Sequence, residues 1–298
     1  MKTENTYSDA EVGFDIPALP GMDEREIQTP CLVIDLDRFE INLKKMVDDL
    51  RPFNVTLRPH AKMHKSVDVA RRQLAFDNTV GICCQKVSEA AAMVAGGIKN
   101  VLVTNQIVAP SKLARLCALA KDAEIAVLCD DAAAVTVLSK AARDAGITLN
   151  VLVEIEVGAG RCGVDPGEPV ATLARLIDAE DGLHFAGLQA YHGSAQHKIT
   201  AEERRLDIES TIEKVKTSKT ALAALGLDRD WVTGAGTGSF PTERDSRHLL
   251  LRRVGPQCET QSAEWRHLAA TVQQLFAATR NAGWVGAAAL LSLPLRSS

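Results

Sequence analysis

Short runs of apolar and β-branched residues alternate with longer amphipathic segments along the first 240 residues of the chain. The apolar runs predict eight strands, at residues 31–36, 55–58, 80–84, 101–104, 125–129, 149–155, 183–190 and 231–233. Helical spacing occurs between them at residues 37–50, 88–95, 130–145 and 201–225, and Gly146 is a candidate C-cap for the third helix. This alternation is typical of a parallel sheet with helical crossovers.

The number of strands decides between two architectures. A (β/α)8 TIM-type barrel usually needs about 250 residues, and eight strands in the first 240 residues suit it. We therefore expect an α/β barrel, with a doubly wound open sheet as the alternative. Chemistry in such barrels is carried by residues that follow the carboxyl ends of the strands, so the polar residues at those positions are the candidate site.

Polar side chains follow most of the predicted strands. The second strand is followed by RPHAKMHKS, which contains His60, Lys62 and His64. The later strands are followed by Gln85, Lys86, Asn105, Gln106, Glu154, Glu156, Arg161, Tyr191, His192 and His197. The eighth strand leads into the glycine-rich run TGAGTGS at residues 233–239.

The glycine-rich run and Lys62 together indicate one cofactor. Successive backbone N–H groups of small residues bind anions, and barrels commonly place phosphate sites after strands seven and eight, although a plain tight turn would also explain the run. A lysine beside two histidines can act as a Schiff-base nucleophile, whereas a solvated surface lysine is the simpler interpretation of Lys62 alone. An aldehyde that carries a phosphate satisfies both features, which predicts pyridoxal 5′-phosphate (PLP).

A metal site on His60 and His64 is disfavoured. Their HxxxH spacing lacks the glutamate of the zincin pattern, because Ala61 stands in its place. Support of Lys62 by the two histidines is the better interpretation of this pair.

Composition excludes several classes of protein. The net charge of −4 gives no reason to expect a nucleic acid or an acidic membrane as partner. Seven cysteines without CxxC spacing indicate a reduced, cytoplasmic protein. The polar N-terminus and the lack of a long uncharged apolar run make secretion and membrane insertion unexpected. A small-molecule ligand is the expected partner.

Five motifs in order resemble a known family. RPHAKMHKS, GICCQKVSEA, VGAGRCGV, GLQAYHGSAQH and TGAGTGS occur as in the D-threonine aldolase and 3-hydroxy-D-aspartate aldolase family of fold type III PLP enzymes. The resemblance extends from about residue 12 to residue 240 and is strongest to the 3-hydroxyaspartate branch. It implies an alanine racemase-like barrel.

The resemblance also implies roles for individual residues. Lys62 would form the Schiff base with PLP, and His197 matches the catalytic histidine. The residues near the cofactor would be Gln85, Arg161, Tyr191, Gly236, Thr237 and Gly238. A D-3-hydroxy amino acid would be cleaved to glycine and an aldehyde: glyoxylate from 3-hydroxy-D-aspartate, or acetaldehyde from D-threonine.

The last 58 residues differ in composition from the rest. Residues 241–298 hold seven Arg, four acidic residues and no Lys. We divide the chain into a leader (1–28), a PLP-binding barrel (29–240) and an atypical tail (241–298), which is either an eighth barrel helix or a frame-altered sequence. The family has a C-terminal β domain that carries the ligands of a divalent metal, Mg or Mn, and we find no such ligands in this chain.

Three functions follow as hypotheses. The first is a PLP-dependent aldolase for D-3-hydroxy amino acids. The second is a non-catalytic PLP-binding barrel left by truncation, and the third is a D-3-hydroxy amino acid dehydratase that uses the same lysine. The resemblance also allows a homodimer.

Overall fold

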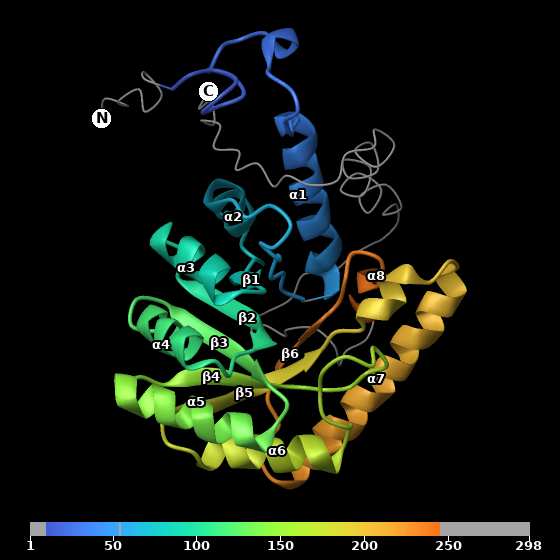
Figure 1. Cartoon of the computed structure of the whole chain (residues 1–298). Helices are drawn as coiled ribbons and strands as arrows, with labels where there is room; N and C mark the ends of the chain where they lie inside the picture. Colours follow the sequence, from blue (N-terminus) through green and yellow to red (C-terminus); the bar gives the residue numbers. More distant parts are fainter. Residues whose placement is uncertain (1–9, 54, 245–298) are drawn as a thin grey trace.

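A computed structural model describes residues 10–53 and 55–244 of the chain. One sheet organises them, and all its neighbouring strands are parallel. The strands are β1 (Ile82–Cys84), β2 (Asn100–Gln106), β3 (Glu124–Cys129), β4 (Leu149–Glu154), β5 (Leu183–Ala190) and β6 (Trp231–Gly234). They lie side by side in the order of the sequence, and the sheet curls as part of a barrel with helices along its outer side (Figure 1).

Helices connect the strands and cover the outer face of the sheet. They are α1 (Leu36–Leu50), α2 (Val67–Leu74), α3 (Val87–Ala95), α4 (Pro110–Leu119), α5 (Ala132–Ala145), α6 (Glu168–Ala179), α7 (Ala201–Ala224) and α8 (Phe240–Arg244), with 3-10 turns η1 (Glu24–Glu26), η2 (Arg51–Phe53) and η3 (Gly193–His197). Local sequence sets their ends. Asp131 caps α5 by accepting hydrogen bonds from two backbone N–H groups, and Gly146, at φ 66°, ends it in the left-handed conformation.

The strands bury both of their faces. Residues such as Val101 and Val103 pack against the helices in the main core, whereas Leu102 between them faces the other way. Leu102, Leu128 and Leu152 belong to a second cluster, which consists of strand residues only. The second cluster therefore fills the inside of the curl, as side chains do in a barrel.

The structure confirms an α/β barrel architecture but corrects the strand count. The described residues form six strands in place of the predicted eight. The last six predictions match β1 to β6, and the second predicted strand, residues 55–58, forms no strand: Leu57 makes an isolated bridge to Thr79. A second isolated bridge, between His60 and Cys83, places the residues that follow it beside β1.

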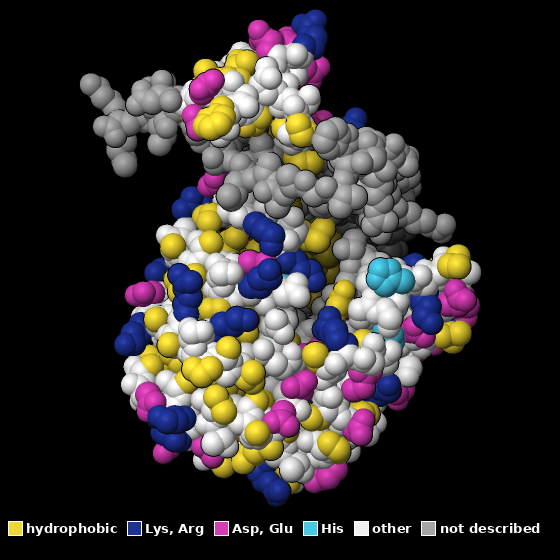
Figure 2. Space-filling model, in the orientation of Figure 1, with side chains coloured by type: hydrophobic (Ala, Val, Ile, Leu, Met, Phe, Trp, Pro, Cys, Tyr) yellow, Lys and Arg dark blue, Asp and Glu magenta, His cyan; other side chains and the backbone are white. Residues whose placement is uncertain are grey.

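The prediction of a first strand at residues 31–36 is wrong. No backbone hydrogen bond joins residues 31–34 to another described residue, and Leu36 already begins α1. Leu32, Val33 and Ile34 are 36%, 52% and 40% exposed. Figure 2 shows hydrophobic side chains on this N-terminal segment, above a barrel face that carries charges of both signs. The apolar pattern is present, but no neighbouring strand among the described residues pairs with it.

The doubly wound alternative is also excluded. A doubly wound sheet reverses its strand order at a switch point and carries helices on both faces. Here the order runs from β1 to β6 without reversal, and the second cluster contains no helix residue.

The helices of residues 10–53 and 55–244 include none with the length and apolar character of a membrane-spanning segment.

Candidate active site

Lys62 lies in a short turn that is fastened to the start of the sheet. Ala61 donates its N–H to the Cys83 carbonyl at 2.8 Å, and Cys83 donates to the Pro59 carbonyl at 2.8 Å. The N–H of Lys65 closes the turn onto the Ala61 carbonyl at 2.7 Å. Ala61 is fully buried, which fixes the backbone of the turn, and the next residue, Lys62, is half-buried.

His60 holds this turn against β2. Its Nδ1 accepts the backbone N–H of Lys62 at 3.3 Å, which leaves Nε2 to donate to Thr104 Oγ1 at 3.0 Å. Thr104 in turn donates to the Cys84 carbonyl at 3.2 Å. Burial, followed by the charge of Lys62, lowers the pKa of His60 to about 4. His60 is therefore a neutral support for Lys62.

His64 has different partners from His60. Its Nδ1 accepts the N–H of Ser66 at 3.1 Å, and burial lowers its pKa. Among the described residues, no group of three or more His, Cys, Asp and Glu side chains is arranged to hold a metal ion. The divalent metal implied by the resemblance has no ligands assigned among these residues.

Gln85 lies at the carboxyl end of β1 and is exposed. Its backbone N–H donates to Glu89 Oε2 at 2.9 Å, and its carbonyl accepts from Asn105 Nδ2 at 3.3 Å. These bonds tie the ends of β1 and β2 together. The side chain of Gln85 is directed by none of them and is open to a ligand.

Arg161 and Tyr191 meet above β4 and β5. Arg161 Cζ lies 5.7 Å from the centroid of the Tyr191 ring, and Arg161 Nη2 donates to Glu154 Oε1 at 3.2 Å. Glu154 is 3% exposed and receives a second hydrogen bond from Gln106 Nε2 at 2.6 Å. Burial raises the pKa of Glu154, against these two bonds, which lower it. The pair fixes a guanidinium group at the carboxyl edge of the sheet.

The glycine-rich loop after β6 donates a backbone hydrogen bond to a side-chain oxygen of another loop. Gly238 donates its N–H to Gln196 Oε1 at 2.7 Å, and Gly236 donates to Ser239 Oγ at 2.9 Å. Thr237 between them is exposed. A Cβ atom on Gly236 would lie 2.5 Å from Gln196 Cδ, so a larger residue at this position would require the Gln196 side chain to move.

A buried acid lies below this loop. Glu243 on α8 is fully buried and accepts a hydrogen bond from Ser239 Oγ at 2.9 Å. Burial raises the pKa of Glu243 to about 7, against the bonds from Ser239 and the backbone amides of Ala235 and Gly236. Sequence reasoning missed Gln196 and Glu243. The only signal for Glu243 is its i, i+4 spacing from Ser239, past the boundary predicted at residue 240.

His192 and His197 differ in their surroundings. His192 is buried, and its Nδ1 accepts the N–H of Ala195 at 3.2 Å, so this side chain holds the η3 turn. The side chain of His197, at the end of that turn, is exposed and makes no hydrogen bond or ion pair with another described residue. Of these two histidines, His197 is therefore the one whose side chain is open to solvent.

The predicted site residues share one edge of the sheet. Lys62 and Gln85 lie at the β1 side, Arg161 and Tyr191 after β4 and β5, and the glycine loop after β6. Direct contacts join Arg161 to Tyr191 within this set. The remaining members are linked by their neighbours, as Lys62 is to His60.

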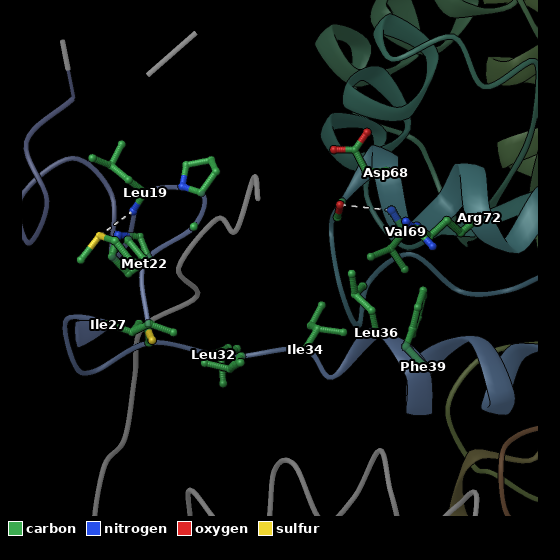
Figure 3. Close-up of a pocket in the computed structure, with 17 residues that line it drawn as sticks. Leu19, Met22, Ile27, Leu32, Ile34, Leu36, Phe39, Asp68, Val69 and Arg72 are labelled. Carbon is green, nitrogen blue, oxygen red and sulfur yellow. Dashed lines mark hydrogen bonds between the residues drawn. The ribbon is translucent and has the colours of Figure 1, made fainter. Parts of the chain in front are cut away.

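An apolar pocket of about 350 Å³ lies elsewhere in the molecule. Leu19, Met22, Ile27 and Leu32 line one side of it, and Val69 of α2 lies on the other (Figure 3). None of the predicted site residues lines this pocket. It is separate from the carboxyl edge of the sheet.

Known proteins resemble this chain in sequence and fold. A 3-hydroxy-D-aspartate aldolase of Paracoccus denitrificans (strain Pd 1222) is 47% identical over 247 residues, which are 83% of this chain and 64% of the relative. A D-threonine aldolase of Arthrobacter sp. is 45% identical over 223 residues, 75% of this chain and 59% of the relative. The crystal structure of D-threonine aldolase from Filomicrobium marinum matches with a TM-score of 0.77 at 44% identity, covering 78% of this chain and 63% of that one.

The chain spans less than two thirds of the length of each of these relatives. The family model described as the alanine racemase N-terminal domain matches residues 34–256, which include all six strands and the glycine loop. The match and the parallel curled sheet agree with one another. The chain belongs to the alanine racemase N-terminal domain family.

Proposed function

We propose that this chain binds PLP and acts in an aldolase that cleaves D-3-hydroxy amino acids to glycine and an aldehyde. One observation carries the proposal: a lysine, a glutamate-held arginine and a glycine loop lie along the carboxyl edge of a single parallel sheet. The similarity to a 3-hydroxy-D-aspartate aldolase and a D-threonine aldolase supports the substrate class. The candidate substrates are 3-hydroxy-D-aspartate and D-threonine.

The residues of the site fit PLP. The amide of Gly238 binds an oxygen acceptor at 2.7 Å, and the space in front of Gly236 holds a carboxamide that a Cβ atom would displace. Such a space, lined by glycines and a backbone N–H group that already donates to an oxygen, suits an oxygen of a phosphate. At the other end of the edge, the amine of Lys62 suits an aldehyde.

Each residue then has a task in the proposed reaction. Lys62 holds the aldehyde of the cofactor, and Gly236, Thr237 and Gly238 hold its phosphate. Arg161, fixed by Glu154 and lying against Tyr191, would contact the ring of the cofactor, and Gln85 at the end of β1 would be a further contact. Bound PLP withdraws electrons from the Cα–Cβ bond as that bond breaks.

His197 is the base that accepts the proton of the substrate 3-hydroxyl. The 3-hydroxyl of the substrate must lose its proton for the carbonyl of the aldehyde to form, and an imidazole is the usual base for such a step near neutral pH. His197 is exposed and makes no hydrogen bond to another described residue, so it is available to accept that proton.

Glycine release tests the proposal. Purified protein with PLP and with Mn or Mg is expected to release glycine from 3-hydroxy-D-aspartate or D-threonine, and Lys62→Ala is expected to release none. Lys121→Ala, which changes an exposed lysine after α4, is the matched control and should keep the activity. Release of ammonia and a keto acid would indicate a dehydratase, and a folded, PLP-loaded protein without any product would indicate a non-catalytic barrel; either result contradicts the proposal.

A further inference from the structure

Gln196 links the turn that carries His197 to the glycine loop. It lies in η3, between β5 and α7, and is half-buried. Its Oε1 accepts the N–H of Gly238 at 2.7 Å, and its Nε2 donates to Ser239 Oγ at 2.8 Å. Both polar atoms of the carboxamide are therefore used on the loop.

The carboxamide completes a chain of hydrogen bonds that ends in the interior. Ser239 Oγ accepts from Gln196 Nε2 and from the Gly236 N–H, and it donates to Glu243 Oε2 at 2.9 Å. Glu243 is fully buried. Glu243 thus supports the loop from the interior through Ser239, and the Gln196 carboxamide occupies the space next to the loop glycines.

Space around the loop is taken up by Gln196. A Cβ atom on Gly236 would lie 2.5 Å from Cδ, 2.6 Å from Nε2 and 2.8 Å from Oε1 of Gln196. A Cβ atom on Gly238 would lie 3.0 Å from the same Oε1. A phosphate that accepts the Gly238 N–H needs the volume that the carboxamide fills, so the two groups would exclude each other.

The rest of the turn is anchored by hydrogen bonds that do not involve Gln196. The Ala195 N–H donates to His192 Nδ1 at 3.2 Å, and Arg204 donates to the carbonyls of Ala195 at 3.3 Å and Lys198 at 3.0 Å. Only Gln196 and His197 lie between these fixed points. A movement of Gln196 that changes the backbone of this short stretch would therefore also move His197.

We propose that Gln196 is a positioning residue, whose carboxamide fills the glycine loop until a phosphate group displaces it and thereby repositions His197. A phosphate forms charge-assisted hydrogen bonds with the loop amides, which are stronger than the neutral bonds of a carboxamide. This inference rests on the proposed function for the identity of the ligand as PLP. The loop and Gln196 are expected to respond to inorganic phosphate as well.

Cofactor affinity gives the first test. Gln196→Ala removes the internal competitor, so the Kd for PLP should fall, by about tenfold if the carboxamide fills the loop nine tenths of the time. The Kd for pyridoxal, which has no phosphate, should not change. Ser194→Ala, in the same turn but directed at His192, is the matched control and should change neither value.

The sign of this effect decides the inference. If Gln196 were an ordinary ligand of the phosphate, Gln196→Ala would weaken PLP binding, and an unchanged or raised Kd overturns the proposal. Gln196→Met, which keeps the size of the side chain without its hydrogen bonds, is the second variant if the alanine variant does not fold. Failure of the proposed function looks different, because the wild-type protein would then bind no PLP at all.

The coupling to His197 has its own readout. Titration of the protein with inorganic phosphate should shift the imidazole NMR signal of His197, identified by its loss in His197→Gln. The signal of His184, an exposed residue of β5, should stay in place. In Gln196→Ala the same titration should leave the His197 signal unmoved, and an equal shift in both proteins would show that His197 does not depend on Gln196.

Discussion

At the residue scale, buried polar groups support the more exposed groups of the candidate site. Neutral His60 accepts the backbone N–H of Lys62, and Glu154 accepts a hydrogen bond from Arg161. Glu243 supports the glycine loop through its hydrogen bond with Ser239. A buried ionisable group is stable only with a partner or without its charge. Glu154 has two donors, whereas Glu243 is held by a hydroxyl and backbone amides, so its protonation is coupled to the folded state.

The pKa of Glu243 predicts a dependence of stability on pH. Burial raises this pKa from 4.5 in the unfolded chain to about 7 in the folded protein, so the folded state binds the extra proton between these values. The stabilisation that comes from protonated Glu243 is fully present below pH 4.5 and is lost as the pH rises to about 7. The free energy of unfolding falls by up to roughly 1.4 kcal/mol per pH unit in this window.

Urea unfolding at a series of pH values measures this dependence. Wild type and Glu243→Gln should be closest in stability at low pH, and the variant should gain relative to wild type as the pH rises through the window. Glu213→Gln, on the exposed side of α7, is the control and should run parallel to wild type. Parallel curves for Glu243→Gln as well would mean that Glu243 keeps its ordinary pKa.

At the element scale, the close packing of neighbouring strands sets the shape of the site. Gly187 in β5 pairs with Trp231 of β6, next to a bulge where the register of β4 against β5 shifts. A Cβ atom on Gly187 would lie 1.9 Å from the Trp231 carbonyl oxygen. This glycine therefore allows β6, and with it the glycine loop, to approach β5.

Gly187→Ala is expected to break the pairing of β5 and β6. Because the clash is with backbone, which cannot rotate away, the loss of unfolding free energy should be roughly 3 kcal/mol or more. Gly226→Ala, at φ 68° with no atom near its Cβ position, carries only backbone strain and should cost about 1 kcal/mol. The two variants are compared by thermal and urea unfolding, and equal losses would show that the approach of the strands is not tight.

The elements were predicted from the sequence where local signals and packing agree. The helix of residues 130–145 and its Gly146 cap were both found, because Asp131 and Gly146 act within the helix itself. The strand expected at residues 31–36 was not found, since an apolar pattern forms a strand only beside a partner. A parallel sheet needs contacts between distant segments, which periodicity does not reveal.

At the scale of the whole molecule, the parallel sheet brings Lys62, Arg161 and Gly236 to one edge despite their separation in sequence. This arrangement could be predicted, because every parallel strand points its carboxyl end the same way. The supporting contacts could not, since Glu243 belongs to no motif and the motif that contains Gln196 does not reveal its contact with another loop. The contact of Gln196 with the glycine loop depends on two loops from different strands meeting.

The central claim is that Lys62 holds PLP at this edge of the barrel. Borohydride reduction of the protein with PLP, followed by peptide mass spectrometry, tests it most directly, because reduction makes the link between lysine and cofactor permanent. We predict one pyridoxyl phosphate group, on Lys62, in wild type and in Lys121→Ala, and none in Lys62→Ala. Label on another lysine, or equal labelling of Lys62→Ala, would contradict the account.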